Sequence, residues 1–170
     1  MQSIAATVND EIIEQRLTRT VDELDETIQQ IRSTIFGLRE NSSGSLRGAV
    51  LAVVDQLAPV LPVRPDTQLV GPLDTVVDHA IVGDVEAVLR ESLTNVAKHA
   101  QASKIRVWIQ ADGQRLAITV TDNGTGLGQS TRRSGLANLH RRAERYGGDF
   151  SVGNAPEGGL RLQWSIPLQE

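Results

Sequence analysis

Seven apolar residues, spaced alternately by four and three positions, constrain this chain more than any other feature of its sequence. No proline or glycine interrupts them before Gly37, and the seven are Leu17, Val21, Leu24, Ile28, Ile31, Ile35 and Leu38. This heptad spacing predicts one helix over about residues 7–39 with an apolar seam along one side. A rod about 50 Å long cannot bury that seam alone. It packs either on its own domain or, as a sustained heptad favours, against helices of another subunit in a coiled coil or four-helix bundle.

A polar break follows the heptad segment and marks a domain boundary. Residues 41–45 read Asn-Ser-Ser-Gly-Ser, a composition typical of linkers. We place the boundary between residues 1–42 and residues 43–170. The first segment carries four basic and eight acidic residues, whereas the remainder carries thirteen of each. A neutral main domain lacks the basic face of a nucleic-acid-binding protein, so we expect no nucleic-acid partner.

Beyond the boundary the periodicity changes to that of a mixed domain. Apolar spacing predicts helices, with Asp84 as the N-cap of the second, and alternation predicts strands, two of them joined by a turn at Asp112-Gly113. The order is helix, strand, helix, two strands, helix, two strands, over residues 46–57, 67–70, 84–100, 104–110, 115–121, 135–146, 150–152 and 160–166. This order predicts an α+β fold, in which helices cover one face of an antiparallel or mixed sheet.

The composition excludes several classes of protein. A chain of 170 residues, 39% apolar and 22% charged, suffices for one globular domain with an appendage. Because it has no cysteine, it has no disulfide, thiolate metal site or cysteine nucleophile. No apolar run reaches the roughly 18 residues of a membrane span, and the N-terminus lacks the order of a secretory signal. We therefore expect a cytoplasmic chain without a membrane span.

Two segments have the residue types of a binding site. On the helix predicted over residues 84–100, Glu91, Asn95 and Lys98 lie within an arc of roughly 60 degrees, opposite the apolar face. His99 falls near the edge of that face, where it is either a packed core histidine or part of the site. An ordinary solvated surface is the alternative for the three polar residues.

The second segment is Asp122-Asn123-Gly124-Thr125-Gly126, directly after a strand with buried spacing. Asp122 would stand at the strand end, and the glycines would let the backbone approach a ligand closely. A simple turn is the alternative for this segment. The chain contains neither the phosphate-loop motif nor a dinucleotide-binding fingerprint in its required context.

Three segments together resemble the ATP-binding domain of sensor histidine kinases. Residues 91–100, 122–126 and 134–148 are similar to that family's N box, first glycine box and a shortened second glycine box, in the family's order. Residues 23–38 are similar to the second helix of its dimerisation domain. The resemblance is to the nitrate-sensor and DesK-like subgroup, and within it to heme-containing oxygen and redox sensors. It implies a Bergerat-type (GHKL) ATP-binding α/β sandwich, preceded by a long coiled-coil dimerisation helix.

The resemblance implies roles for the first two boxes. Asp122 would accept a hydrogen bond from the adenine amino group, and Gly124 and Gly126 would leave room for the base and the ribose. Asn95 would ligate Mg²⁺ through its amide oxygen, a hard ligand suited to an ion that shares the phosphates. Lys98, and less strongly His99, would face the phosphate oxygens.

The resemblance implies further roles near the reacting phosphate. Gly135 and Leu136 would close a lid, and the amides of the following helix would favour an anion. Arg132 and Arg133 are lid residues that either assist or are merely solvated. Arg133 also stands where the family usually has another glycine, which affects the lid more than adenine binding. Glu91 would polarise a water molecule or the attacking group.

The implied reaction moves the γ-phosphoryl group of ATP to a histidine and then to an aspartate of a response regulator. In the family that histidine lies on the first helix of the dimerisation domain. The histidines here are His79, His99 and His140, none of them in the heptad helix. We therefore expect this chain to bind Mg-ATP without phosphorylating itself, and to form a homodimer through its N-terminal helix in the full-length protein.

Two other functions suit the same sequence. An anti-sigma-factor serine kinase uses the same boxes, but it does not need the heptad helix. A nucleotide-free dimeric interaction module would keep the boxes only as structure. Titration with Mg-ATP separates the two kinases from the interaction module.

Overall fold

The computed structural model describes residues 45–126 and 133–168. The predicted heptad helix and residues 127–132, which include Arg132 of the predicted lid, lie outside the described residues. The chain divides into two units, Met1–Ser42 and Ser43–Glu170, and every described residue belongs to the second. The elements in chain order are α2 (Leu46–Leu57), the 3₁₀ turn η1 (Ala58–Val60), β1 (Asp66–Val70), α3 (Leu73–Val76), α4 (His79–His99), β2 (Ile105–Ala111), β3 (Arg115–Asp122), α5 (Arg133–Arg145), β4 (Asp149–Asn154) and β5 (Leu160–Pro167).

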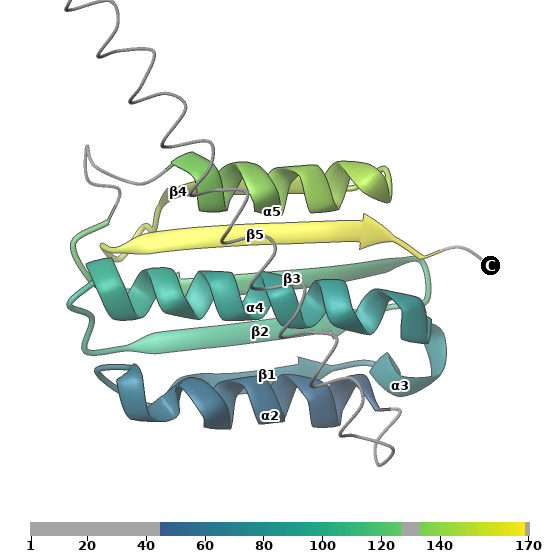
Figure 1. The fold of residues 1–170 in the computed structure, drawn as a ribbon, viewed down its shortest axis with the longest axis horizontal. Coiled ribbons are helices and arrows are strands. Elements are labelled where there is room, and N and C mark those ends of the chain that lie inside the picture. The colour runs from purple at the N-terminus through teal and green to yellow at the C-terminus, as the bar shows by residue number, and fades with distance from the viewer. Residues whose placement is uncertain (1–44, 127–132, 169–170) are drawn as a thin grey trace, which may run out of the picture. The chain divides into compact units, whose positions relative to one another are not determined.

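The strands form one five-stranded sheet in the order β1-β2-β3-β5-β4, shown face-on in Figure 1. β1 pairs with β2 in parallel, and every other neighbouring pair is antiparallel. Both predicted hairpins, β2–β3 and β4–β5, are present. The last strand inserts between β3 and β4, so that Trp164 lies opposite both Ile118 and Phe150.

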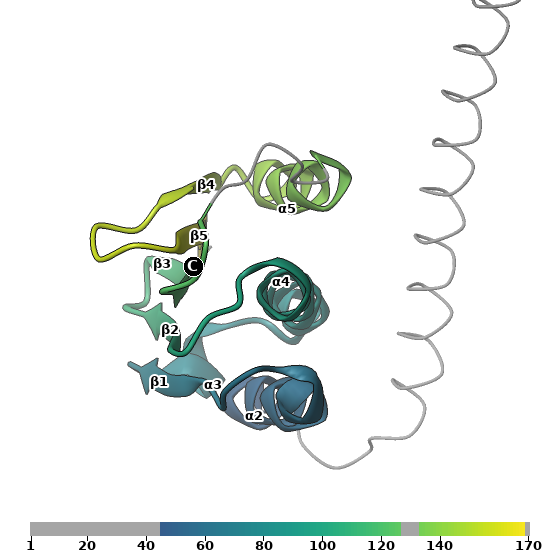
Figure 2. The ribbon, with the colours of Figure 1, turned by 90° about the vertical axis from the view of Figure 1, so that its left-hand side faces the viewer.

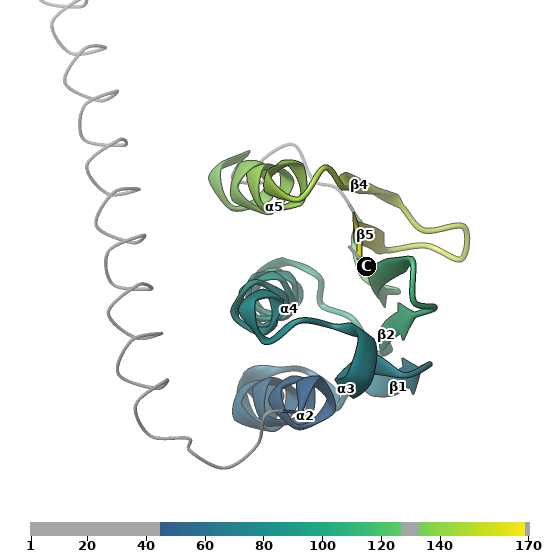
Figure 3. The same ribbon diagram turned by 90° about the vertical axis from the view of Figure 1, so that its right-hand side faces the viewer.

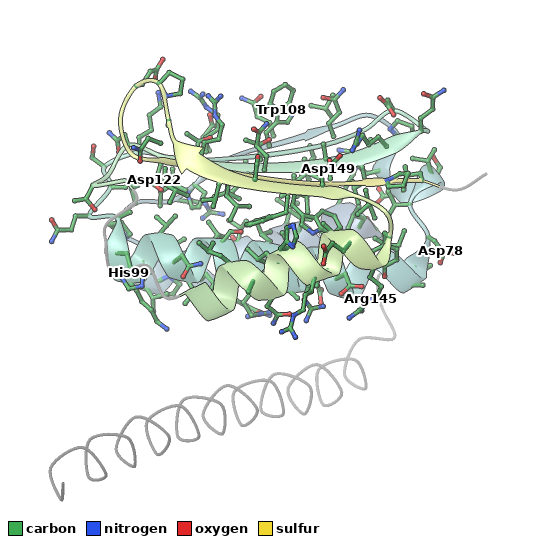
Figure 4. All side chains as sticks on the ribbon, turned by 90° about the horizontal axis from the view of Figure 1, so that it is seen from above. Asp78, His99, Trp108, Asp122, Arg145 and Asp149 are labelled. Atoms are coloured by element: carbon green, nitrogen blue, oxygen red, sulfur yellow. The ribbon has the colours of Figure 1, made fainter. Side chains whose placement is uncertain are left out.

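Helices α2, α4 and α5 lie side by side on one face of the sheet, as Figures 2 and 3 show end-on. Along β2 the side chains of Ile105, Val107 and Ile109 are buried beneath them. Trp108 points to the other face and is 45% exposed (Figure 4). This alternation is the expected pattern of a sheet with one covered face.

The predicted helix 46–57 is confirmed as α2 with the same bounds. Ser45 caps it, because its Oγ accepts a hydrogen bond from the Gly48 amide at 3.2 Å. Among the described residues, no helix is both long and apolar enough to cross a bilayer.

The prediction that Asp84 caps the next helix is wrong. Helix α4 begins at His79, and the cap is Asp78, whose side chain accepts from the Ala80 amide at 2.9 Å. Ile81 already belongs to the buried face of the helix, four residues before Val85. Asp84 is therefore an interior residue of α4, and it is 8% exposed.

Candidate functional site

A pocket lies between the C-terminal half of α4, the start of α5 and the end of the sheet at which β3 finishes and β5 begins. Its volume is about 180 Å³, below the roughly 300–1,000 Å³ of sites that enclose a drug-sized ligand. The pocket is therefore too small to enclose a whole drug-sized ligand. It is lined by Ser92, Asn95, Val96, His99, Ala100, Val120, Asp122, Thr125, Gly126, Leu136, Leu160 and Leu162.

Asp122 is the buried carboxylate of this pocket. It is the last residue of β3 and is 4% exposed (Figure 4). Its Oδ1 accepts from the Gly124 amide at 2.8 Å and, at a longer 3.4 Å, from the Leu160 amide. Within the described residues, Oδ2 has no hydrogen-bond donor. Asp122 therefore combines a fixed orientation with one oxygen that is available to a ligand.

The loop after Asp122 is held against the end of α4. Thr125 donates twice to it, from its amide to the Ala100 carbonyl at 2.9 Å and from Oγ1 to the His99 carbonyl at 3.0 Å. A Cβ at Gly124 would lie 1.9 Å from the Ala100 carbonyl oxygen. Glycine is therefore required at position 124 by the packing of the loop on α4, whatever the loop binds.

The turn between β4 and β5 packs on the other side of the same loop. Gly126 has φ +73°, and a Cβ on it would lie 2.9 Å from Asn154 Oδ1. Gly159 has φ +81°, and its Cβ would lie 2.1 Å from the Asp122 carbonyl oxygen. The loop that carries Asp122 is thus enclosed by two segments far apart in the sequence, which fixes its backbone.

The polar residues of α4 are only partly brought together. Asn95 is half-buried and lines the pocket, and its Nδ2 donates to Glu91 Oε1 at 3.3 Å. His99 is exposed and lines the pocket mouth (Figure 4). Lys98 is exposed and does not line the pocket. Of the two alternatives for His99, packing in the core is therefore not observed.

Helix α5 supplies the remaining wall. Leu136 lines the pocket. Gly135 faces α4 so closely that a Cβ on it would lie 2.0 Å from Glu91 Oε1. The start of α5 therefore meets α4 at the residue that also holds the Asn95 amide.

Sequence reasoning missed several residues that line the pocket. Ser92 is the residue that the sequence could most readily have predicted, because Ser92, Asn95, Val96 and His99 follow the spacing of one helix face. Leu160 and Leu162 had the alternation of a strand, but their place beside Asp122 depends on the pairing of β5 with β3.

The described residues contain no group of three or more His, Asp or Glu side chains that would hold a metal ion by themselves. A metal at this pocket would therefore depend on oxygens of the bound ligand. Such sharing is usual for Mg²⁺, which keeps several waters and takes few protein ligands. The donor set, with one half-buried amide, fits that ion.

Residues 82–170 match a family described as histidine kinase-, DNA gyrase B- and HSP90-like ATPases, and the chain belongs to this family. Several of its relatives are sensor histidine kinases. The chain is 31% identical over 147 residues to the sensor histidine kinase YxjM of Bacillus subtilis. This alignment covers 84% of the chain and 35% of YxjM. It is 31% identical over 153 residues to the nitrate/nitrite sensor protein NarX of Escherichia coli, covering 86% and 25%. DesK of Bacillus subtilis is 38% identical over 82 residues, covering 46% of this chain and 22% of DesK.

The chain thus spans between a fifth and about a third of the length of these relatives. The predicted resemblance to sensor histidine kinases of the nitrate-sensor and DesK-like kind is confirmed.

The solved structures agree on the fold. Full-length ShkA in complex with AMPPNP has a TM-score of 0.59 at 22% identity, over 71% of this chain and 29% of ShkA. The ATP-binding domain of PrrB from Mycobacterium tuberculosis has a TM-score of 0.53 at 22% identity, over 72% and 93%. The predicted ATP-binding α/β sandwich is confirmed.

Proposed function

We propose that this chain is the ATP-binding catalytic part of a two-component sensor histidine kinase. In this proposal it transfers the γ-phosphoryl group of Mg-ATP to a histidine of the kinase, and a response regulator then receives the group on an aspartate. The observation that carries the proposal is the buried carboxylate of Asp122 at the base of a pocket, in a chain of this ATPase family.

Asp122 is the proposed reader of adenine. Its free Oδ2 accepts a hydrogen bond from the exocyclic amino group of the base. Guanine presents a carbonyl oxygen at the same position, which repels a carboxylate, so the pocket prefers adenine. The apolar lining from Val96, Leu136 and Leu162 packs on the ring.

The phosphates are proposed to lie toward the pocket mouth, near Asn95, Lys98 and His99. Asn95 donates its Nδ2 to Glu91, which leaves its Oδ1 as the ligand for Mg²⁺. When bound, the ion neutralises phosphate charge as the group is transferred. Lys98 and His99 are exposed, and they donate to phosphate oxygens.

Glu91 is proposed to orient the Asn95 amide rather than to act only as a base. Both its 3.3 Å hydrogen bond with Asn95 and its closeness to Gly135 support this role. A Glu91→Gln variant tests it. The glutamine side chain still offers a carbonyl oxygen to the Asn95 amide, so ATP affinity is kept, whereas phosphoryl transfer falls only if Glu91 also polarises the attacking group.

The wider protein is proposed to resemble its relatives. Residues 1–42 then form the second helix of a dimerisation domain, through which the full-length protein is a homodimer and on which a receiver domain docks. The protein is proposed to work in the cytoplasm and to resemble the heme-containing sensors DosS and DosT. The acceptor histidine lies outside this chain.

The test of the proposed function begins with calorimetric titration of Mg-ATP into the full chain. Wild type should bind ATP and prefer it to GTP. Asp122→Asn should weaken ATP about 10- to 100-fold, because the acceptor for the amino group is lost in a buried site. Asp112→Asn is the matched control, since Asp112 also accepts from two backbone amides but lies in the exposed β2–β3 turn. Absence of binding in wild type would refute the proposal.

A second experiment tests the reaction. The chain and Mg-ATP are mixed with a separately made dimerisation domain that bears the acceptor histidine. Acid-labile phosphate on that histidine is the expected product. Phosphate on serine instead would favour the anti-sigma-factor type of kinase.

A further inference from the structure

Two contacts between helices α4 and α5 lie two helical turns apart. At the pocket, Gly135 lies against Glu91. Farther along, Arg142 and Tyr146 meet Asp84. Glu91 lies seven positions after Asp84, and Arg142 lies seven positions after Gly135. The two helices therefore run antiparallel in one register, beside each other in Figure 1.

The second contact is a polar cluster of α4 and α5. Asp84 Oδ1 accepts from Arg142 Nη1, and Asp84 Oδ2 accepts from the Tyr146 hydroxyl at 2.6 Å. Arg145 Nη1 lies 3.6 Å from the same Oδ2, with a 63% exposed side chain (Figure 4). We call Asp84, Arg142 and Tyr146 the α4–α5 tie. It joins a buried carboxylate to a guanidinium and a phenol, so every charged oxygen has a donor.

The tie is one of few contacts between α4 and α5, although α5 also packs on β4 and β5, and its Leu139 and Ala143 are buried. Helix α4 packs extensively against α2 but touches α5 at few points. A paired buried charge also restricts register more than apolar contact does, because sliding by one residue would leave the carboxylate without its donors. The tie therefore constrains the register of α5 against α4, in addition to the packing of α5 on the sheet.

We propose that Asp84, Arg142 and Tyr146 are positioning residues for nucleotide binding, which hold α5 so that Gly135 and Leu136 complete the pocket wall. The proposal rests on the proposed function, because it requires a nucleotide in the pocket. None of the three residues lines the pocket, so they act through α5.

The first test compares Mg-ATP affinity between full-chain variants. Asp84→Asn should bind Mg-ATP about tenfold more weakly, because α5 loses its fixed register. Its preference for ATP over GTP should remain, since Asp122 is intact. Asp74→Asn is the matched control. Asp74 accepts hydrogen bonds from Ser45 Oγ and the Arg47 amide at the start of α2, away from the pocket. Asp74→Asn should therefore bind Mg-ATP within about twofold of the wild-type affinity.

A double mutant separates a tie from independent effects. Arg142→Met keeps the aliphatic stem of the side chain and removes the guanidinium. Asp84→Asn with Arg142→Met should bind Mg-ATP no more weakly than Asp84→Asn alone, because both changes break the same contact. Losses that multiply would overturn the assignment. Should Asp84→Asn fail to fold, Tyr146→Phe replaces it, with an expected loss of about threefold.

A spectroscopic readout tests coupling directly. Tyr146 is the one tyrosine of the chain, so tyrosinate absorbance reports it alone. Burial, followed by the hydrogen bond to Asp84 and its charge, raises the pKa of Tyr146, and Arg145 and Arg142 lower it. Ionised Tyr146 cannot donate to Asp84, so ionisation breaks the tie. By reciprocity, saturating Mg-ATP should move the tyrosine titration to higher pH.

The outcomes distinguish the two proposals. Wild type that fails to bind Mg-ATP overturns the proposed function and this inference together. Wild type that binds, with Asp84→Asn and Tyr146→Phe equally tight and a tyrosine titration unmoved by nucleotide, overturns the inference alone and leaves the tie a structural contact.

Discussion

Asp84 and Asp122 are the two carboxylates that the described residues bury, at 8% and 4% exposure, and the protein treats them differently. Asp84 meets the side chains of Arg142 and Tyr146, which satisfy both of its oxygens. Among the described residues, Asp122 accepts only from backbone amides, and both hydrogen bonds go to one oxygen. A carboxylate matched by side-chain donors joins two helices, whereas one held by amides keeps an oxygen for a ligand. The comparison shows that the partners of a buried charge, more than its burial, indicate its role.

The largest effect should separate the two aspartates by stability. Asp84→Ala should lower the free energy of unfolding by about 3 kcal/mol, because it leaves the partly buried Arg142 unpaired. Asp122→Asn should lower it by less than about 1 kcal/mol, since its amide oxygen still accepts from Gly124. Denaturation in urea measures both. Asp84→Leu combined with Arg142→Met should recover most of the loss, and equal losses at the two aspartates would contradict the comparison.

The next effect concerns what holds Asp122. Gly159→Ala should lower the free energy of unfolding by about 2 kcal/mol or more, because φ is +81° and the Cβ would overlap the Asp122 carbonyl. Gly158→Ala is the matched control, with φ +90° and open space around the Cβ, and it should cost about 1 kcal/mol. Thermal unfolding gives the difference. Similar losses of stability in the two variants would show that the turn between β4 and β5 does not pack tightly against the Asp122 loop.

A smaller effect should appear at alkaline pH. The folded pKa of Tyr146 is raised, mainly by burial and then by Asp84. Its contribution to stability is therefore complete below about pH 10, the ordinary value for tyrosine, and is lost as pH rises through the folded pKa. Tyr146→Phe should cost about 1 kcal/mol at neutral pH and should flatten the decline of stability above about pH 10. An identical decline in both proteins would argue against the Asp84 contact.

The smallest effect belongs to an exposed aspartate. The hydrogen bond from the Arg47 amide, against some desolvation, holds the pKa of Asp74 below its ordinary value. Its contribution is therefore present above the unfolded pKa and is lost as pH falls through the lower folded value. Asp74→Asn should make acid unfolding less steep below about pH 4. Because solvent screens this group, the change should be much smaller than at Asp84.

The sequence predicted the local parts of the site well. Helix α2 has the predicted bounds, and Asp122 stands at the buried end of β3 as expected. The apolar face of α4 was also predicted from spacing. Each of these follows from the pattern of neighbouring residues, which sets the exposed and buried sides of a helix or strand directly.

Asp84 shows where such reasoning ended. An aspartate before an apolar-periodic segment has the pattern of an N-cap, and Asp78 has that pattern too. Only the packing of α5 against α4 brings Arg142 and Tyr146, some sixty residues later, to the Asp84 carboxylate. Whether Asp78 or Asp84 is the N-cap of α4 therefore depends on contacts with residues that are distant in the sequence.

By itself, the sequence determined the longer helices and strands and the residues of the glycine loop, because periodicity and turn chemistry are local, and the resemblance of three segments indicated the family. Helix α3 and the start of α4 were not predicted. The tertiary structure alone decided that β5 inserts between β3 and β4, that Leu160 and Leu162 line the pocket with Asp122, and that Gly124 must make room for α4. Those outcomes depend on surfaces meeting across long chain separations, where burial and steric fit select one arrangement from several that the local pattern allows.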